Sequence, residues 1–169
     1  NLTANGAWKE NSAWSSPWVD STTQVGTYAS ITSTVAGGST LTIGTGESVT
    51  TDAVVLTGAS TSDLTISGGT LNLIGPGILR IDSADKKLTI NSTLSGKATI
   101  DGAGTVVFGQ NQTLSGLSGA GNLDIGSTTL TLTSELQTLT IGNLLGTGTL
   151  SLKMSNNGDH TGNSIINLG

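Results

Sequence analysis

Four times along this 169-residue chain, two glycines separated by one residue precede a short run of alternating apolar residues. The pattern Gly-x-Gly-x-apolar-x-apolar stands at 75–81, 102–108, 119–125 and 146–152, so the middle interval is shorter than the two that flank it. Looser relatives begin at Gly37 and Gly68. An internal repeat of this kind is typical of stacked, solenoid-like architectures.

Each repeat predicts a short β-strand that follows a sharp corner. Residues alternate between apolar and polar over four or five positions, as in the Leu-Thr-Ile units at 41–43, 64–66, 88–90 and 139–141. A period of two is typical of a half-buried strand. The glycines supply the positive φ or the close approach that a corner needs. No long stripe with a helical period is present, so the chain is expected to be all-β.

The spacing of the apolar pairs favours a β-solenoid over a sandwich. The pairs follow one another closely, so two or three strands make one coil of roughly 17 to 27 residues, close to the usual repeat length of solenoids. Sandwich strands are usually longer and joined by hairpins, although a sandwich or jelly roll stays an alternative. We expect a parallel β-helix of six to seven coils, with a capping region at 1–36 and solenoid repeats at 37–169.

The amino-acid composition excludes several classes of function. The net charge is −5 and only 10% of the residues are charged, whereas nucleic-acid binding needs clustered Lys and Arg. No apolar run is long enough to cross a bilayer, so direct membrane insertion by this fragment is not expected. The chain has no cysteine, which excludes disulfides and thiolate metal sites. We expect no nucleic-acid partner, no cofactor and no metal.

The end of the chain resembles the passenger domains of bacterial autotransporters. Their strand repeat reads approximately Gly-x-Gly-Thr-Leu-Thr-Leu, a polar loop, then Tyr/His-Thr-Gly-x-Thr-x-Ile-Asn-x-Gly. Residues 146–152, the loop through 156–159 and residues 160–169 match it, with His160 in place of the usual tyrosine. Residues 88–108 look like the spacer before such repeats. The resemblance implies a right-handed parallel β-helix, export through the outer membrane, and a C-terminal translocator barrel. Since no such barrel is expected within this sequence, the resemblance also implies that the repeats at 37–169 are truncated at the C-terminus.

Aromatic residues gather at the start of the chain. Four of the five stand no later than position 28, namely Trp8, Trp14, Trp18 and Tyr28. They are expected to cap the open end of the solenoid, because such an end exposes core and unpaired strand edge. The alternative is a platform on which sugar rings stack.

Four charged residues are the strongest candidates for chemistry, because carboxylates on the outside of a β-helix can act on polysaccharides. They are Arg80, Asp82, Asp85 and Asp101. Arg80 is expected to point outward between Leu79 and Ile81, and the favoured interpretation of the group is a solvated ion pair between coils. We therefore predict no catalytic residue and no enzyme.

Three further features favour a structural interpretation over a functional one. His160, the only histidine, lacks partners for a triad or a metal site. The Thr-x-Thr rows at 40–42, 129–133 and 138–140 could bind ice, but their period is irregular for a flat lattice. The stretch 119–124 falls short of a calcium-binding nonapeptide.

The expected function is a structural or adhesive segment of a secreted or cell-surface bacterial passenger. Its partners would be a host surface, a neighbouring cell or another copy of the chain. A polysaccharide-active or polysaccharide-binding β-helix, or a phage tail fibre, is the alternative. An ice-binding solenoid is a minor one.

Overall fold

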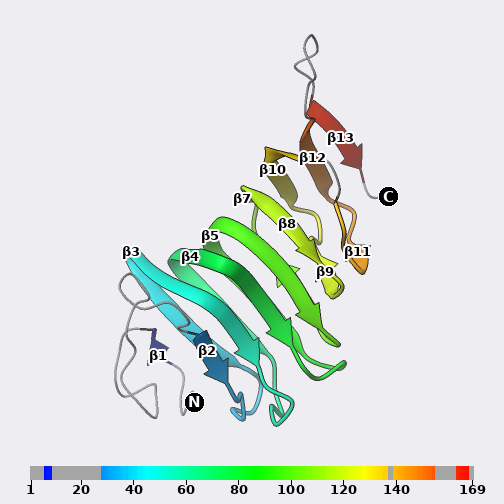
Figure 1. Cartoon of the computed structure of the whole chain (residues 1–169). Coiled ribbons are helices and arrows are strands. Elements are labelled where there is room, and N and C mark those ends of the chain that lie inside the picture. Colours follow the sequence, from blue (N-terminus) through cyan, green and yellow to red (C-terminus); the bar gives the residue numbers. More distant parts are fainter. Residues whose placement is uncertain (1–5, 9–27, 137–138, 155–162, 168–169) are drawn as a thin grey trace.

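A computed structural model describes residues 6–8, 28–136, 139–154 and 163–167, and in those ranges it contains strands and turns but no helix. Figure 1 shows the strands stacked along one axis, with β1 and β2 at one end and β12 and β13 at the other. The strands are β1 (Gly6–Ala7), β2 (Tyr28–Ile31), β3 (Ser39–Leu56), β4 (Leu64–Ile81), β5 (Lys87–Gly102), β6 (Thr105–Phe108), β7 (Gln112–Leu114), β8 (Gly116–Gly119), β9 (Asn122–Asp124), β10 (Thr129–Leu136), β11 (Asn143–Leu145), β12 (Thr149–Met154) and β13 (Asn163–Asn167).

The coils of β3, β4, β5 and β6–β8 contain three strand segments, which we call A, B and C, whereas the described strands of the later coils supply only A and B. In β3, β4 and β5 the segments follow one another within a single bent strand, and irregularities in the pairing register separate them. In later coils each segment is a separate short strand. Segment A comprises 39–43, 64–67, 87–90, β6, β9 and β11; segment B comprises 48–51, 70–73, 93–96, β7, β10 and β12; segment C comprises β2, 53–56, 78–81, 97–102 and β8.

The pairing between coils is parallel, as expected for a β-solenoid. The antiparallel pair of β12 and β13 departs from this rule at the C-terminal end. The stack has about five turns, fewer than the six to seven expected. The difference arises because the first coils are long: Ser39 pairs with Leu64 and Leu64 with Leu88, whereas the step from Leu88 to its partner Val106 is shorter.

Aliphatic side chains fill the interior in ladders that run from coil to coil. In segment A, one ladder consists of Leu64, Leu88, Val106 and Leu123, which are register partners and all fully buried. Burying one such side chain stabilises the fold by about 1.5–3 kcal/mol. The intervening residues, such as Thr65, point outward, so the period of two in the sequence corresponds to inside and outside.

The two glycines of the repeat serve different physical needs. Gly102 has a φ of 89°, a region that side chains rarely adopt. Gly104 has no positive φ, but a Cβ on it would lie 2.3 Å from Cγ2 of Ile81 and 2.6 Å from the carbonyl oxygen of Ser83. The first glycine therefore turns the chain and also lies close to the previous coil, since a Cβ on Gly102 would be 2.2 Å from the carbonyl oxygen of Ile81. The second is needed for the close approach alone.

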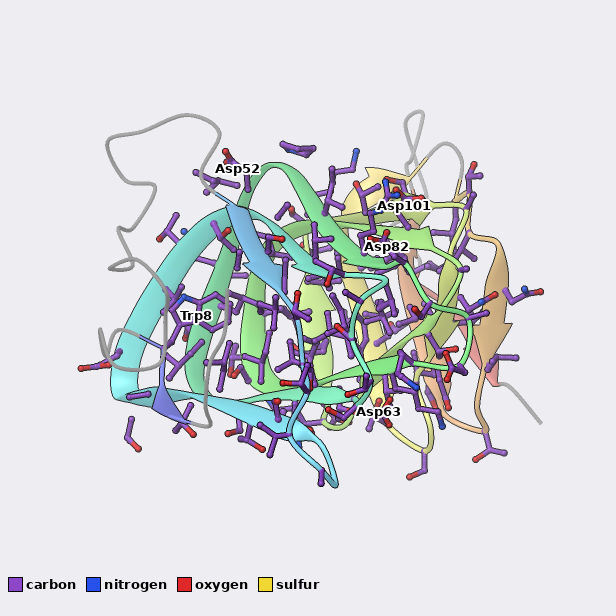
Figure 2. The ribbon with its side chains drawn as sticks, turned by 90° about the horizontal axis from the view of Figure 1, so that it is seen from below. Trp8, Asp52, Asp63, Asp82 and Asp101 are labelled. Atoms are coloured by element: carbon purple, nitrogen blue, oxygen red, sulfur yellow. The ribbon has the colours of Figure 1, made fainter. Side chains whose placement is uncertain are left out.

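Parts of the predicted capping region join the solenoid itself. Strand β1 pairs with segment A of β3, and β2 pairs with segment C of β3. Trp8, directly after β1, is fully buried and its backbone N–H donates to the carbonyl oxygen of Thr42 at 2.7 Å. Figure 2 shows Trp8 at the β1 end of the stack. The boundary at 36/37 stays a prediction.

Candidate functional site

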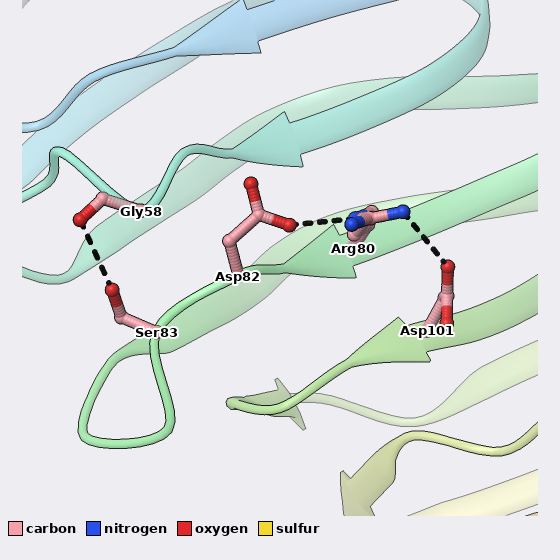
Figure 3. A network of polar contacts seen from close by, with 5 residues as sticks. All are labelled: Gly58, Arg80, Asp82, Ser83 and Asp101. Atoms are coloured by element: carbon pink, nitrogen blue, oxygen red, sulfur yellow. Dashed lines mark hydrogen bonds and ion pairs between the residues drawn. The ribbon is translucent and has the colours of Figure 1, made fainter.

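Three of the four charged candidates meet on the outside of segment C, as Figure 3 shows. Arg80 lies in β4 between two buried residues and points outward, as predicted. Its Nε donates to Oδ1 of Asp82 at 2.6 Å, and an Nη donates to Oδ2 of Asp101 at 3.4 Å. Asp101 is the register partner of Arg80 in the next coil. The hydrogen bond to Asp82 and the two negative charges raise the pKa of Arg80 above its ordinary value.

The Arg80 network is a solvent-exposed ion pair between coils. The side chains of Arg80, Asp82 and Asp101 are 49%, 30% and 47% exposed. Both carboxylates are directed at the same guanidinium, so the ion pairs link β4 to β5. Exposed pairs of this kind contribute little to stability. Next to them, Oγ of Ser83 donates to the carbonyl oxygen of Gly58 at 3.3 Å, a second link between coils (Figure 3).

Asp85 lies apart from the Arg80 network. It accepts a 2.5 Å hydrogen bond from Nζ of Lys86, and that bond holds the pKa of Asp85 below its ordinary value, helped by a bond from its own backbone amide. Asp85 and Lys86 line a hollow of about 320 Å³ together with Asp63. Figure 2 shows Asp63 well apart from Asp82 and Asp101, which lie close together. The four candidates therefore do not form one cluster.

The aromatic candidates divide between described and undescribed residues. Trp8 is fully buried, so it offers no open face on which a sugar ring could stack. Trp14, Trp18 and His160 lie outside the described residues, and only the backbone of Tyr28 is described. Capping by the aromatic residues stays a prediction.

Threonine columns run along the outside of segment A. Thr40, Thr65 and Thr89 are register partners, and the column continues at Val107. The neighbouring column contains Thr42, Ser67 and Asn91. Both columns are uncharged from β3 to β5 but mixed in residue type, and the first continues from Val107 to Asp124 in β9. They therefore differ from the uniform threonine lattice that an ice-binding surface requires. Thr138 lies outside the described residues.

The corner between segments A and B carries a feature that the sequence did not reveal. A groove of about 430 Å³ opens there, and we call it the corner groove. Its walls come from successive coils, which only the register brings together. The glycine pair at 68–69 was visible in the sequence as a loose repeat, but nothing marked it as the floor of a groove. The lining residues are Thr45, Gly46, Gly68, Gly69, Thr70, Asn91, Thr93 and Gln110.

Metal-binding and membrane-spanning features are both absent from the part of the chain that the structure describes. No group of three or more His, Cys, Asp or Glu residues there is arranged to hold a metal ion. The same residues include no helix with the length and apolar character needed to cross a membrane.

Comparisons with known proteins identify no relative. No known family, no curated protein and no solved structure matches the chain. The likeness to autotransporter passengers therefore rests on the repeat residues alone, most clearly those at 88–169.

Proposed function

We propose that this chain is a structural and adhesive segment of a secreted or cell-surface bacterial β-helical passenger. The observation that carries the proposal is the continuous aliphatic core through in-register coils, from Leu64 to Leu123. Such a core makes a rigid rod, because each coil packs on the next along the whole stack. At about 4.8 Å per coil, five coils extend roughly 24 Å.

The outer surface supports adhesion or self-association. From β3 to β5, the columns that contain Thr40 and Thr42 on segment A present hydroxyl and amide groups without charge. Flat, uncharged strand surfaces meet without the electrostatic repulsion and desolvation that charged ones carry. Partners would be a host surface, a neighbouring cell or a second copy of the chain.

Bead clumping tests this proposal. Beads coated with the chain are expected to clump, and to attach to cells, more than beads coated with an unrelated soluble protein. Thr65→Lys places a charge in the centre of the segment A columns and should reduce clumping, whereas Thr113→Lys, on segment B, should not. Beads that stay dispersed and unattached would contradict the adhesive role.

The secretion class has its own test. The repeat likeness at 146–169 supports export as a passenger. The complete reading frame is expected to encode a signal sequence before this chain and a β-barrel after it. A frame with neither would contradict the autotransporter assignment but leave the rod-like role open.

A polysaccharide-binding β-helix is the second candidate function. The corner groove favours it, since its size lies within the range of about 300–1,000 Å³ that is usual for ligand sites. The catalytic version is less well supported, because Asp82 and Asp101 are both engaged with Arg80.

A further inference from the structure

The floor of the corner groove is bare backbone, and the fold requires it to be so. Gly68 has a φ of 76°, and a Cβ there would lie 2.3 Å from the carbonyl oxygen of Ile43. A Cβ on Gly69 would lie 2.6 Å from the carbonyl oxygen of Glu47. Side chains are therefore excluded from both positions, and the groove cannot be filled from below.

The walls of the groove repeat from coil to coil. Thr70 and Thr93 are register partners at the start of segment B, and Asn91 is the partner of Ser67 at the end of segment A. Parallel coils are about 4.8 Å apart. Polar groups thus recur along the rod at a spacing close to the length that one pyranose unit adds to an extended glycan.

The polar side chains of the groove are not used by the fold. Within the described ranges, no hydrogen bond joins the side chains of the five polar lining residues to another protein group; they are Thr45, Thr70, Asn91, Thr93 and Gln110. By contrast, the side-chain amide of Asn122, near another corner, forms hydrogen bonds within the protein: its Nδ2 donates to the carbonyl oxygens of Ala103 and Gly104 at 3.2 Å. The groove therefore presents donors and acceptors that a ligand can take.

The uncharged lining of the corner groove indicates which class of ligand fits it. None of the lining residues is ionisable, whereas the smaller hollow contains Asp63, Asp85 and Lys86. Hydroxyl and amide groups both donate and accept hydrogen bonds, which suits a ligand rich in hydroxyls and without charge. An anionic glycan would find no cation in the lining to pair with.

We infer that the corner groove binds an extended, neutral oligosaccharide that lies along the rod axis. The inference goes beyond the adhesive function: it rests on the polysaccharide-binding candidate and names the class of glycan that the groove takes. Since the lining contains no aromatic ring, binding depends on hydrogen bonds, and a dissociation constant of about 1 mM is expected.

Titration of the isotope-labelled chain, followed by NMR, tests the inference. The probes are cellohexaose, maltohexaose and chitohexaose, with a heparin-derived hexasaccharide as the charged comparison. At least one neutral probe should shift the backbone amide signals of Thr45, Thr70 and Thr93, and the charged probe should not. If all three neutral probes leave these signals unmoved at about 10 mM, or if heparin acts equally, the inference is wrong.

Two matched variants test whether the oligosaccharide binds in the corner groove. Thr93→Val keeps the branched shape but removes an exposed hydroxyl, and it should raise the dissociation constant about two- to tenfold. Thr113→Val makes the same change on β7, outside the groove, and should leave the constant unchanged. Equal weakening by both variants would overturn the assignment to the groove. The amide spectra of both variants also report whether they remain folded.

The outcome is separable from that of the adhesive function. Chain-coated beads that clump and attach to cells, while no neutral probe binds, would contradict only the groove. Probe binding without clumping or attachment would contradict only the adhesive role.

Discussion

The side-chain amide of Gln112 bonds to the backbone carbonyl of Ser92 and replaces a missing stretch of backbone ladder there. Its Nε2 donates to the carbonyl oxygen of Ser92 at 2.8 Å, and its Oε1 accepts from the backbone N–H of Leu94 at 2.9 Å. A peptide group in a parallel ladder bonds in the same way to the two neighbours of the residue it faces, here Thr93. Gln112 is 2% exposed. The side chain of Gln112 therefore links β7 to segment B of β5, while the backbone of β7 pairs with β10 on its other side.

Gln112→Leu should destabilise the fold by about 2–4 kcal/mol, because two buried backbone groups would lose their partners. Urea unfolding followed by circular dichroism measures the change. Gln110→Leu is the control: its side chain lies in the corner groove, and a change below about 0.5 kcal/mol is expected. Equal effects of the two substitutions would show that the amide bridge contributes nothing of its own.

Ser92→Ala should leave stability unchanged or raise it by up to about 1 kcal/mol. The side chain of Ser92 is fully buried, and among the described residues its Oγ has no hydrogen-bond partner. Burying a hydroxyl without a partner is unfavourable, so its removal is expected to cost nothing. A loss above about 1 kcal/mol in the same unfolding measurement would mean that a partner of this hydroxyl exists.

Gly102→Ala should be more destabilising than Gly37→Ala. Both glycines have a positive φ, of 89° and 86°, so both substitutions meet a backbone penalty of about 1–2 kcal/mol. At Gly37 a Cβ would meet nothing within 4 Å, whereas at Gly102 it would lie 2.2 Å from the carbonyl oxygen of Ile81. The difference in unfolding free energy between the two variants therefore isolates the close approach of the coils. Similar losses would contradict this.

The pKa of Asp85, measured by NMR titration, should lie below the ordinary value for an aspartate. The hydrogen bond from Lys86 is the main cause, and the charge of the ammonium adds to it. Because the folded-state pKa is lowered, the stabilisation is present above the unfolded-state pKa and is lost as the pH falls through the folded-state value. Salt should weaken the charge contribution, since the carboxylate is exposed.

Lys86→Met supplies the control for this titration. It keeps most of the side-chain length but removes the ammonium group, and the pKa of Asp85 should move back up. An unchanged pKa in the variant would assign the shift to the backbone amide instead.

The strands and corners of this protein could be predicted because they are local properties of the chain. The alternation at 64–66 and 88–90 decides which side chains are buried, and the same alternation at 79–81 placed Arg80 outside. The glycine at 102 marks a corner because few other residues adopt its backbone angle. These features need no knowledge of which strand lies beside which.

The remaining features were decided by the tertiary structure, because they depend on the register between coils. The number of coils follows from partners such as Ser39 and Leu64, which the irregular period of the repeat did not reveal. Asp101 joins Arg80, and Asp85 does not, for the same reason.

The Gly-x-Gly repeat by itself determined a glycine-turned, all-β chain with an aliphatic interior. Only stacking decided that Gln112 completes a ladder and that Thr70, Asn91 and Thr93 share one groove. The physical reason is that alternation and turn preferences act within a few residues, whereas a groove or a bridging amide forms between residues about one coil apart, and the coil length varies along the chain.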